Sequence, residues 1–457
     1  MTPPTYNSWG LVAPIGQTAR RLAPDASLLP LEGLGTNGYL PYGNGRSYGD
    51  SCLNADGLLL DMRGLKRVLA FDVRDGILEA EAGLLLSDIL EFIVPRGWFL
   101  PVTPGTRFVT LGGAVANDVH GKNHHARGTI GRFVEGFELW RSDGSTRWCS
   151  AKENADLYRA TIAGMGLTGV MMRIKLRLIP IESPDIDQTI TPFASLGEFG
   201  AMVDEKNAKF EYTVAWVDST ARGKNLGRGF LIAGNHAKSD GRRLTVPPAK
   251  GWLSVPFTPP IAAINRYSLK AFNTAYHAAT RRSAGQRRVP YAPFFYPLDA
   301  VSHWNRLYGP RGLLQHQCIV PFKGGIETVT ALFDACHKAN AASFLTVLKT
   351  FGDAPSPGLL SFPRPGYTLT LDFPNQGERT HRLFDELDRI VTAAGGAVNP
   401  YKDARMAPET FGASFPNWTA LDRLRDPLAS SSFWRRVTNG ASLASPPAAA
   451  TAELQLT

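Results

Sequence analysis

Short apolar runs separated by glycine-rich turns dominate the first 180 residues of the chain. The pattern predicts a strand, a turn and a second strand within residues 37–61, and further strands at 77–82, 137–140, 146–149 and 166–180. Apolar residues at helical spacing predict one helix over residues 84–94. In the last of the strands, lysine and arginine alternate with apolar residues, which indicates one solvent-facing side rather than a membrane span.

After residue 180 the pattern changes, and residues 181–184 resemble a linker. Strands are predicted at 212–217, 313–320, 343–350 and 367–373, and helices near 196–205, 325–339 and 379–394. The segment 221–290 contains two Pro-Pro pairs and has weak periodicity, so no regular structure is predicted for it. The tail from Ser445 to Thr457 is rich in Ala, Pro and Thr and is expected to fray.

Length and composition favour a folded protein of two domains. The chain has 457 residues, 44% of them hydrophobic and 19% charged. Its four cysteines include no CxxC pair, which indicates reduced thiols. The N-terminus lacks the apolar run of a signal peptide, and no uncharged apolar run reaches the ~18 residues of a membrane span. We therefore expect a cytoplasmic protein or one held peripherally at the inner membrane.

The net charge of +9 is concentrated in one segment. Residues 221–290 hold thirteen lysines and arginines against one acid, Asp240. Such a segment suits an anionic lipid surface, a phosphorylated substrate or nucleic acid, and the plain alternative is a solvated loop. Nucleic acid is not favoured, because the chain shows neither a known binding module nor aromatic residues at stacking spacing.

Three glycine-rich loops carry the candidate chemistry. The first, YGNGRSYGD at 42–50, can turn tightly and present successive backbone N–H groups to an anion such as a pyrophosphate. In the second, residues 104–125, TLGG opens a helical stretch whose free N–H groups are expected to bind phosphate. The third is GMGLTG at 164–169. The histidines of the second loop do not predict a metal site, because His124 and His125 are adjacent and only Asp118 accompanies them.

Together these loops resemble the flavoproteins of the vanillyl-alcohol oxidase type, and within them the decaprenylphosphoryl-β-D-ribose 2′-oxidase family. GRSYGD, PGTR, HGKNHH and GLTG stand in the family's order, and the resemblance extends through most of the chain. It implies an α+β fold in which a two-subdomain PCMH-type FAD-binding domain carries an inserted α+β substrate domain. The FAD-binding domain would comprise residues 1–183, the substrate domain 184–395, and residues 396–457 would return to the FAD-binding domain.

The resemblance also implies which residues hold FAD. Carried over position by position, the FAD contacts are Gly43, Asn44, Gly45, Arg46, Ser47, Tyr48, Gly105, Thr110, Gly112, Gly113, Asn117, His120 and Val170. Many relatives attach the flavin through a histidine of the first loop, where this chain has Arg46. Arginine cannot form that bond, so non-covalent FAD is expected.

For the substrate side, the resemblance implies the polar residues Tyr48, Lys122, Gln315, Gln317, Lys349 and Lys402, with Trp216 either stacking on the substrate or filling core. Lys402 is the favoured neighbour of the reacting hydroxyl, as a base if its pKa is lowered or as a charged anchor for the alkoxide if it is not. Lys122 and Lys349 are candidate partners for a substrate phosphate. The plain alternative for each lysine is a surface charge.

By resemblance, the substrate is a prenyl-phosphate-linked ribose, oxidised at the 2′ carbon in the first half of an epimerisation that makes an arabinose donor for the cell envelope. A separate NAD(P)H-dependent reductase would complete it. Four pocket positions depart from mycobacterial members, with Thr370 for cysteine, Thr368 for asparagine, and Asn399 and Phe295 for tyrosines. The alternative is a soluble aldonolactone or alditol oxidase that uses oxygen.

Overall fold

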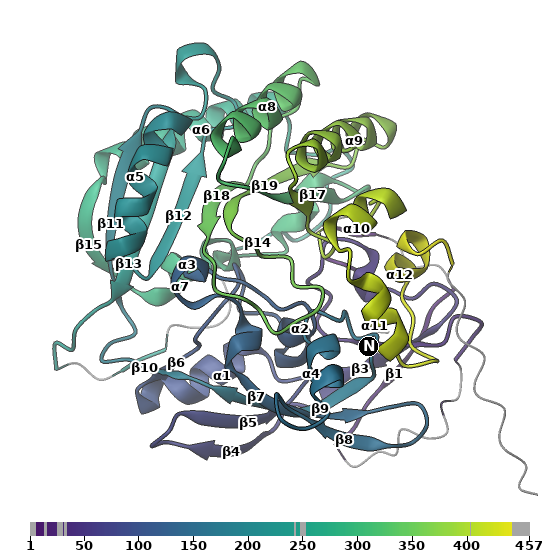
Figure 1. The fold of residues 1–457 in the computed structure, drawn as a ribbon. Helices are drawn as coiled ribbons and strands as arrows, with labels where there is room; N and C mark the ends of the chain where they lie inside the picture. The colour runs from purple at the N-terminus through teal and green to yellow at the C-terminus, as the bar shows by residue number, and fades with distance from the viewer. Residues whose placement is uncertain are drawn as a thin grey trace, which may run out of the picture.

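The chain forms a mixed α+β structure built on two main sheets, one above the other in Figure 1. This computed structural model describes residues 6–12, 16–24, 31, 34–241, 244–246, 253–402 and 404–440. The lower sheet comes from the first 180 residues and the upper sheet from the rest of the chain. The predicted tail, Ser445–Thr457, lies outside the described residues.

The lower sheet has five antiparallel strands. In spatial order they are β4 (Val68–Asp72), β5 (Ile77–Glu81), β9 (Val170–Arg177), β7 (Val134–Trp140) and β8 (Thr146–Cys149). The basic residues of β9 lie on one face, where Arg173 pairs with Glu79 at 2.7 Å and with Glu138 at 3.0 Å. The alternate residues Ile174 and Leu176 are fully buried. The predicted strand with one polar face is therefore confirmed.

The first loop follows a small parallel sheet beside the lower sheet. Its strands lie in the order β1 (Thr18–Arg21), β3 (Leu58–Asp61) and β2 (Tyr39–Tyr42). Helix α1 (Leu86–Ile93) turns Ile89, Leu90 and Ile93 inward, as its spacing predicts. The end of β2 directs the glycine-rich loop at 43–49 towards the centre of the molecule.

The upper sheet has eight strands. In spatial order they are β15 (Gly285–Val289), β11 (Ile186–Phe193), β13 (Gly229–His236), β12 (Tyr212–Val217), β18 (Thr346–Phe351), β19 (Gly366–Pro374), β17 (Leu313–Val320) and β20 (Ala397–Val398). Helices α5 (Leu196–Lys209), α8 (Gly325–Lys338) and α9 (Glu378–Ala393) cover one face of this sheet. Strands β17 and β19 are buried along most of their length, and they bury polar residues as well as apolar ones: Gln315, His316, Gln317, Thr368, Thr370 and Asp372.

The prediction that residues 221–290 lack regular structure is wrong. The segment contains β13, the 17-residue helix α6 (Arg266–Arg282) and β15. Helix α6 begins with a capping box between Asn265 and Ser268, but it buries only Leu269, Asn273 and Thr280. Leu269, Phe272 and Tyr276 do stand at helical spacing, so the sequence held a helical signal that the prediction passed over. Residues 242–243 and 247–252 of the segment, among them Arg242, Arg243, Lys250 and Trp252, lie outside the described residues.

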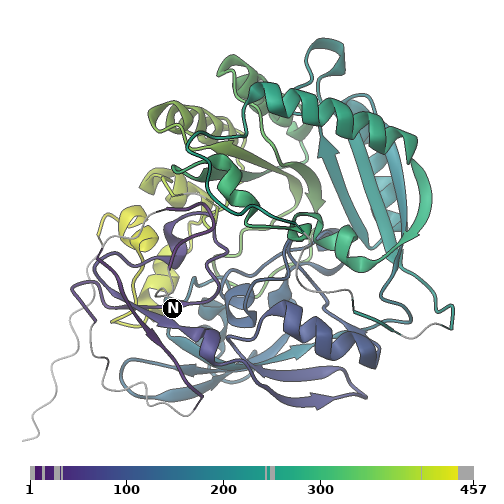
Figure 2. The same ribbon diagram turned by 180° about the vertical axis from the view of Figure 1, so that it is seen from behind.

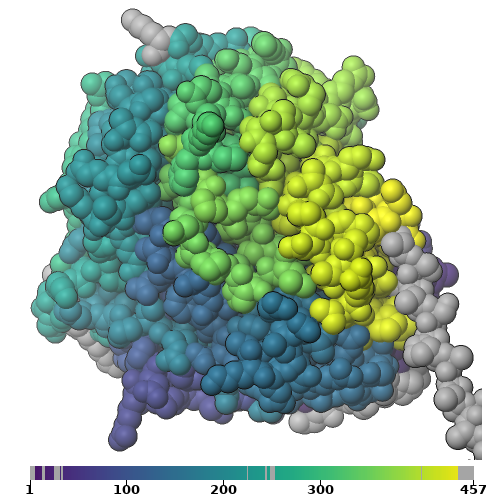
Figure 3. Space-filling view, in the orientation of Figure 1, coloured from purple at the N-terminus to yellow at the C-terminus, as the bar shows by residue number. Residues whose placement is uncertain are grey.

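The C-terminal residues link the upper sheet to the N-terminal half. After β20 come α10 (Pro408–Ser414), α11 (Trp418–Leu424) and α12 (Ser432–Val437). Backbone hydrogen bonds then join Asp426 N to Leu167 O at 2.9 Å, and Ser432 N to Leu53 O at 2.8 Å. In Figure 3 this yellow region packs against both the green and the blue parts of the surface. The domain limits near 183 and 396 stay predictions.

Candidate active site

Residues from both halves of the molecule line a cavity of about 620 Å³. The glycine loop at 43–48 and helix α2 (Leu111–Ala116) contribute from the N-terminal half, and β12, β17, β18 and the segment 399–402 from the other. A volume of this size suits a cofactor or a small-molecule ligand. Of the residues that the sequence analysis nominates, those lining the cavity are Gly43, Asn44, Gly45, Arg46, Ser47, Tyr48, Gly105, Thr110, Gly112, Gly113, Asn117, His120, Lys122, Trp216, Gln315, Gln317, Lys349 and Lys402.

Val170 is the nominated residue whose side chain does not line the cavity. It is fully buried at the start of β9, whereas its neighbours Gly169 and Met171 line the wall. Side chains alternate across a strand, so Val170 points to the opposite face. A contact between its backbone and FAD therefore stays a prediction.

The first loop offers backbone N–H groups to a ligand. Among the residues that the structure describes, none accepts a hydrogen bond from the N–H groups of residues 44–47. Gly45 has a φ of +57°, and a Cβ there would lie 2.2 Å from the Tyr42 hydroxyl oxygen, so glycine is required. Unpaired, successive amides beside a cavity form the kind of nest that binds a pyrophosphate.

The expectation for the second loop needs correction. The N–H groups that open helix α2 already have acceptors: Leu111 N donates to Leu84 O at 2.8 Å, and Gly112 N to Ala82 O at 2.7 Å. Gly113 N donates to the capping Thr110 hydroxyl at 3.1 Å. The helix start therefore offers no free amide there. Gly112 instead allows close packing, because a Cβ at this position would lie 2.9 Å from the Ala82 Cβ.

Arg46 lies in an aromatic setting at the cavity wall. Its guanidinium carbon is 4.2 Å from the centre of the Trp9 ring and 5.6 Å from that of Phe108. Burial lowers the pKa of Arg46, while Asp299 acts to raise it. Cys52 lines the same cavity, and burial raises the pKa of its thiol to about 12.

Three lysines converge on the cavity from distant parts of the chain. Burial lowers the pKa of Lys122 and of Lys349 to about 7 each, and that of Lys402 to about 8. Lys122 Nζ donates to the Phe294 carbonyl. The plain alternative of solvated surface charges is wrong for all three, because each lines the cavity and loses hydration there.

Lys349 and Lys402 have different partners. Lys349 Nζ lies 3.4 Å from His120 Nδ1, and Lys402 Nζ lies 4.5 Å from the centre of the Tyr48 ring. Burial, and to a smaller extent the positive charge of Lys349, lowers the pKa of His120 well below its ordinary value. This imidazole is therefore neutral at neutral pH. Tyr48 stays protonated, since burial raises its pKa. Of these four side chains, the two lysines are therefore the ones that carry positive charge near neutral pH.

Asn399 and Thr368, two of the residues that differ from the family pattern, fix the orientation of Gln317. The Asn399 side-chain amide donates to Gln317 Oε1 at 2.9 Å, and Gln317 Nε2 lies 3.3 Å from the Thr368 hydroxyl. The same Nε2 lies 3.2 Å from His120 Nε2. Thr370, opposite Gln317 in the β17–β19 register, lines the cavity. Thr368 thus acts behind Gln317, whereas Asn399 and Thr370 both line the cavity.

Trp216 and Phe295 form apolar parts of the wall. The half-buried Trp216 stacks on Phe230 with ring centres 6.1 Å apart and meets the edge of Tyr276 at 4.9 Å. Phe295 is buried and packs on Phe99 and Tyr212. Trp216 therefore both fills core and presents a surface to a ligand.

Sequence reasoning missed Asp372 and Tyr276. Gln315 Nε2 donates to an Asp372 carboxylate oxygen, and burial raises the pKa of Asp372 to about 7, opposed by Gln315 and Lys402. Asp372 is the one acidic residue in strand β19, and this isolated acid was the sequence feature that could have revealed it. Tyr276 lines the cavity from α6 and could not be found, because no helix was predicted there.

Comparison with known proteins identifies the class. Residues 37–150 match a family model described as an FAD binding domain, the part of the chain that holds the glycine loop and α2. The amide nest and the cavity fit such a cofactor. The chain is thus an FAD-dependent oxidoreductase of the kind that acts on alcohol and sugar groups.

A longer match gives the family. Over 406 residues the chain is 34% identical to decaprenylphosphoryl-beta-D-ribose oxidase of Mycolicibacterium smegmatis, covering 86% of this chain and 87% of that protein. The chain belongs to the family of that oxidase. Shorter matches link it to L-gulonolactone oxidase of Mus musculus, 30% identical over 30% of this chain and 31% of that protein. Delta(24)-sterol reductase of Homo sapiens is 28% identical over 26% of this chain and 23% of its own length.

Among the described residues, no helix is both long enough and apolar enough to cross a bilayer.

Proposed function

We propose that this oxidoreductase converts the 2′-hydroxyl of a polyprenyl-phosphoryl ribose to a keto group, as the first half of an epimerisation. The observation that carries the proposal is the convergence of Lys122, Lys349 and Lys402 on one cavity beside the FAD-binding loops. Three amines in a partly dehydrated cavity favour an anionic substrate, which a phosphate-linked sugar provides. The near full-length similarity to decaprenylphosphoryl-beta-D-ribose oxidase points to the same substrate class.

Bound FAD would supply the acceptor for the hydride that leaves the carbon of the alcohol. The loop at 43–48 would hold the pyrophosphate, with Gly105, Thr110, Gly112, Gly113, Asn117, His120 and the Val170 backbone along the rest of the cofactor. Non-covalent attachment is part of the proposal. Arg46 replaces the histidine of relatives, and the raised pKa of Cys52 leaves little thiolate for an alternative bond.

The amines divide two tasks between them. Lys402 accepts the proton of the reacting hydroxyl, because a pKa of about 8 leaves part of it neutral near pH 7. Tyr48, which lies beside Lys402, and Gln315, which lines the same cavity, orient the hydroxyl. Lys122 and Lys349 bind the phosphate, whose negative charge raises the pKa of both and keeps them protonated. Gln317 and Trp216 position the sugar.

The product would leave as a keto sugar on its lipid phosphate. Completing the epimerisation needs a hydride donor, which a separate NAD(P)H-dependent reductase would provide. No role in nucleic-acid binding is proposed.

The test is anaerobic mixing of the purified protein with farnesyl-phosphoryl ribose while the visible flavin absorption is followed. Bleaching by this compound, but not by free ribose or L-gulono-1,4-lactone, is expected. Bleaching by the lactone alone, with hydrogen peroxide formed in air, would replace the proposal by a soluble aldonolactone oxidase. Acid precipitation tests the attachment: FAD that leaves with the supernatant is non-covalent, and FAD that stays in the pellet is not.

A further inference from the structure

Exposed apolar side chains gather on one short segment of the surface. The described residues expose eight large hydrophobic side chains, and five of them fall between residues 253 and 272: Leu253, Phe257, Ile261, Tyr267 and Phe272. Ile261 is the most exposed, at 80%. Such a concentration differs from the scattered apolar residues of an ordinary surface and indicates contact with an apolar partner.

The same segment is basic and has no acidic residue. Residues 253–298 contain neither Asp nor Glu. The cations among them are all exposed: Arg266, Lys270, Arg281, Arg282, Arg287 and Arg288. Arg288 pairs with Asp187 on the neighbouring strand at 2.8 Å, which leaves the helix cations as the main charge of this surface. Apolar side chains flanked by cations complement an anionic lipid surface rather than an acidic or a purely apolar protein.

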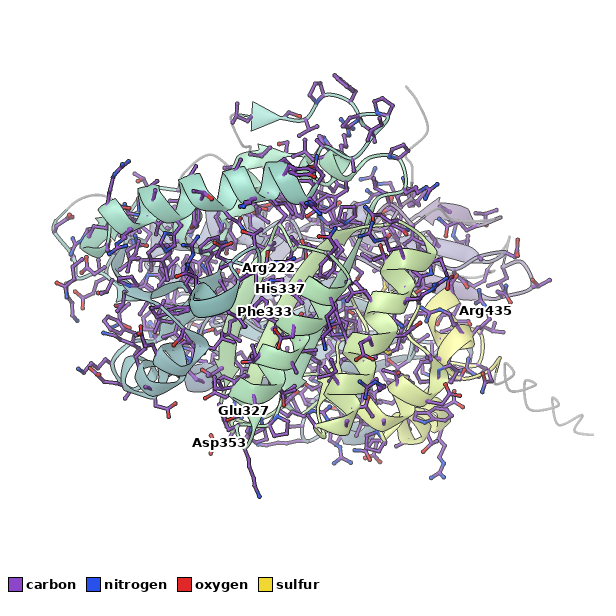
Figure 4. The ribbon with its side chains drawn as sticks, turned by 90° about the horizontal axis from the view of Figure 1, so that it is seen from above. Arg222, Glu327, Phe333, His337, Asp353 and Arg435 are labelled. Atoms are coloured by element: carbon purple, nitrogen blue, oxygen red, sulfur yellow. The ribbon has the colours of Figure 1, made fainter. Side chains whose placement is uncertain are left out.

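The two parts of the segment lie on one side of the molecule. In Figure 4, helix α6 and the projecting strand β14 (Leu253–Ser254) lie at the same edge of the molecule. Figure 2, the view from behind, shows α6 running along the back of the molecule. We call residues 253–261 together with the exposed face of α6 the apolar-basic surface. Ile264 lies between the two parts of this surface but is buried, in a cluster with Leu269 and Trp304.

The apolar-basic surface is continuous with the cavity wall. Strand β14 pairs with β16 (Val301–Ser302), and both residues of β16 line the cavity. On α6, the exposed Phe272 stacks on Tyr276 with ring centres 5.9 Å apart, and Tyr276 lines the cavity. A partner bound to the surface would therefore lie against the wall that receives the substrate.

We propose that the apolar-basic surface docks this protein on an anionic lipid bilayer. Phe257, Ile261 and Tyr267 enter the headgroup region, and Arg266, Lys270, Arg281 and Arg282 contact lipid phosphates. The inference deepens the proposed function, since a lipid-linked sugar could pass from the bilayer into the cavity beside β16. Binding is measured without any substrate, so its failure and the failure of the proposed oxidation can be told apart.

The experiment is co-sedimentation of the purified FAD-loaded protein with phosphatidylcholine vesicles, with and without phosphatidylglycerol. Binding is expected with the anionic vesicles and should weaken as salt is added. The double variant Ile261→Ser/Lys270→Glu should reduce the binding constant at least about tenfold. A matched control, Val73→Ser/Arg74→Glu, changes an exposed apolar and an exposed basic residue beside β4, on the lower sheet, and should bind as the unchanged protein does.

Flavin absorption and thermal melting of each variant establish that it is folded. Equal binding of the two double variants would overturn the proposal, as would absence of binding by the unchanged protein. A dimer in analytical ultracentrifugation that only Ile261→Ser/Lys270→Glu abolishes, without vesicle binding, would assign the surface to a second copy of the chain instead.

Discussion

The two sides of the cavity are built differently. One side, formed by the loop at 43–48 and α2, is rich in glycine, and its loop offers the N–H groups of residues 44–47, unpaired within the described part of the chain. The other side consists of long side chains from distant strands, with Lys349 on β18, Gln315 and Gln317 on β17, and Lys402 after β20. After the proposed function, we call the first the cofactor half and the second the substrate half.

The departures that the family resemblance implies follow this difference. Of the four positions, Thr370, Asn399 and Phe295 line the cavity in the substrate half, and Thr368 lies behind Gln317. A side chain can change while the strand that carries it stays in place, whereas a glycine under close contact cannot change without moving the backbone. Substrate selection can therefore vary over a constant cofactor site.

Lys402→Met separates the two halves most strongly. Removing the amine should lower the rate constant of flavin reduction by about 10²–10⁴-fold, the range for loss of a general base. FAD content should not change, because the cofactor half is untouched. Stopped-flow absorption with farnesyl-phosphoryl ribose measures the rate, and Lys152→Met, at an exposed lysine, is the control. Loss of FAD from Lys402→Met would show that the two halves are not separable.

Gly112→Ala tests the cofactor half. The added Cβ would meet the Ala82 Cβ at 2.9 Å and displace α2, at an overpacking cost of about 1–3 kcal/mol. FAD affinity should fall roughly 10- to 100-fold, as measured by titrating the apoprotein and following flavin fluorescence. Gly412→Ala, where a Cβ meets nothing within 4 Å, should bind FAD normally. If both variants bind FAD equally, close packing of α2 does not shape the cofactor site.

The sequence predicted the cofactor half better than the substrate half. Glycine spacing located the loop at 43–49 in the cofactor half, whereas in the substrate half the limits of strand 313–320 were predicted but not what its side chains contact. The start of α2 was misjudged, because a sequence can show a helix start but not that the carbonyls of Leu84 and Ala82 take its amides. Local backbone geometry can be predicted from local residues, but hydrogen bonds that a neighbouring element makes to the backbone cannot.

The substrate half depended on resemblance, since nothing local in the sequence brings residues 122, 349 and 402 together. Asp372 was missed because its role arises from burial beside Gln315, which only tertiary structure reveals. Helix α6, and with it Tyr276, was missed although Leu269, Phe272 and Tyr276 stand at helical spacing, because the Pro-Pro pairs before it made the whole segment resemble irregular chain. Long-range assembly, buried polar residues and the Pro-Pro pairs account for these failures.

Asp372→Asn tests the electrostatics of the substrate half. If neutral Lys402 is the base, flavin reduction should rise with pH through about 8, because deprotonation yields the active form. The Asp372 carboxylate acts to raise the pKa of Lys402, so its removal should lower that pKa and move the rising limb to lower pH. The rate at pH 7 should then increase a few-fold. Asp334→Asn, at an exposed acid on α8, should leave the profile unchanged. A rate that instead falls with pH would make Lys402 a charged anchor.

Thr370→Cys is expected to have the smallest effect on the reaction and the clearest chemical signature. Threonine and cysteine are similar in size, and Thr370 has no catalytic task in the proposed function, so flavin reduction should change less than about threefold. The family resemblance implies that mycobacterial members carry a cysteine at this position that reacts with nitro-aromatic inhibitors, so the unchanged protein, with Thr370, should form no such adduct. Thr370→Cys should gain the mass of one inhibitor in intact-protein mass spectrometry after turnover. The native Cys52 lines the same cavity, but burial raises its pKa to about 12, so it should stay unmodified. An adduct on the unchanged protein would show that Cys52 is reactive and would weaken the argument for non-covalent FAD.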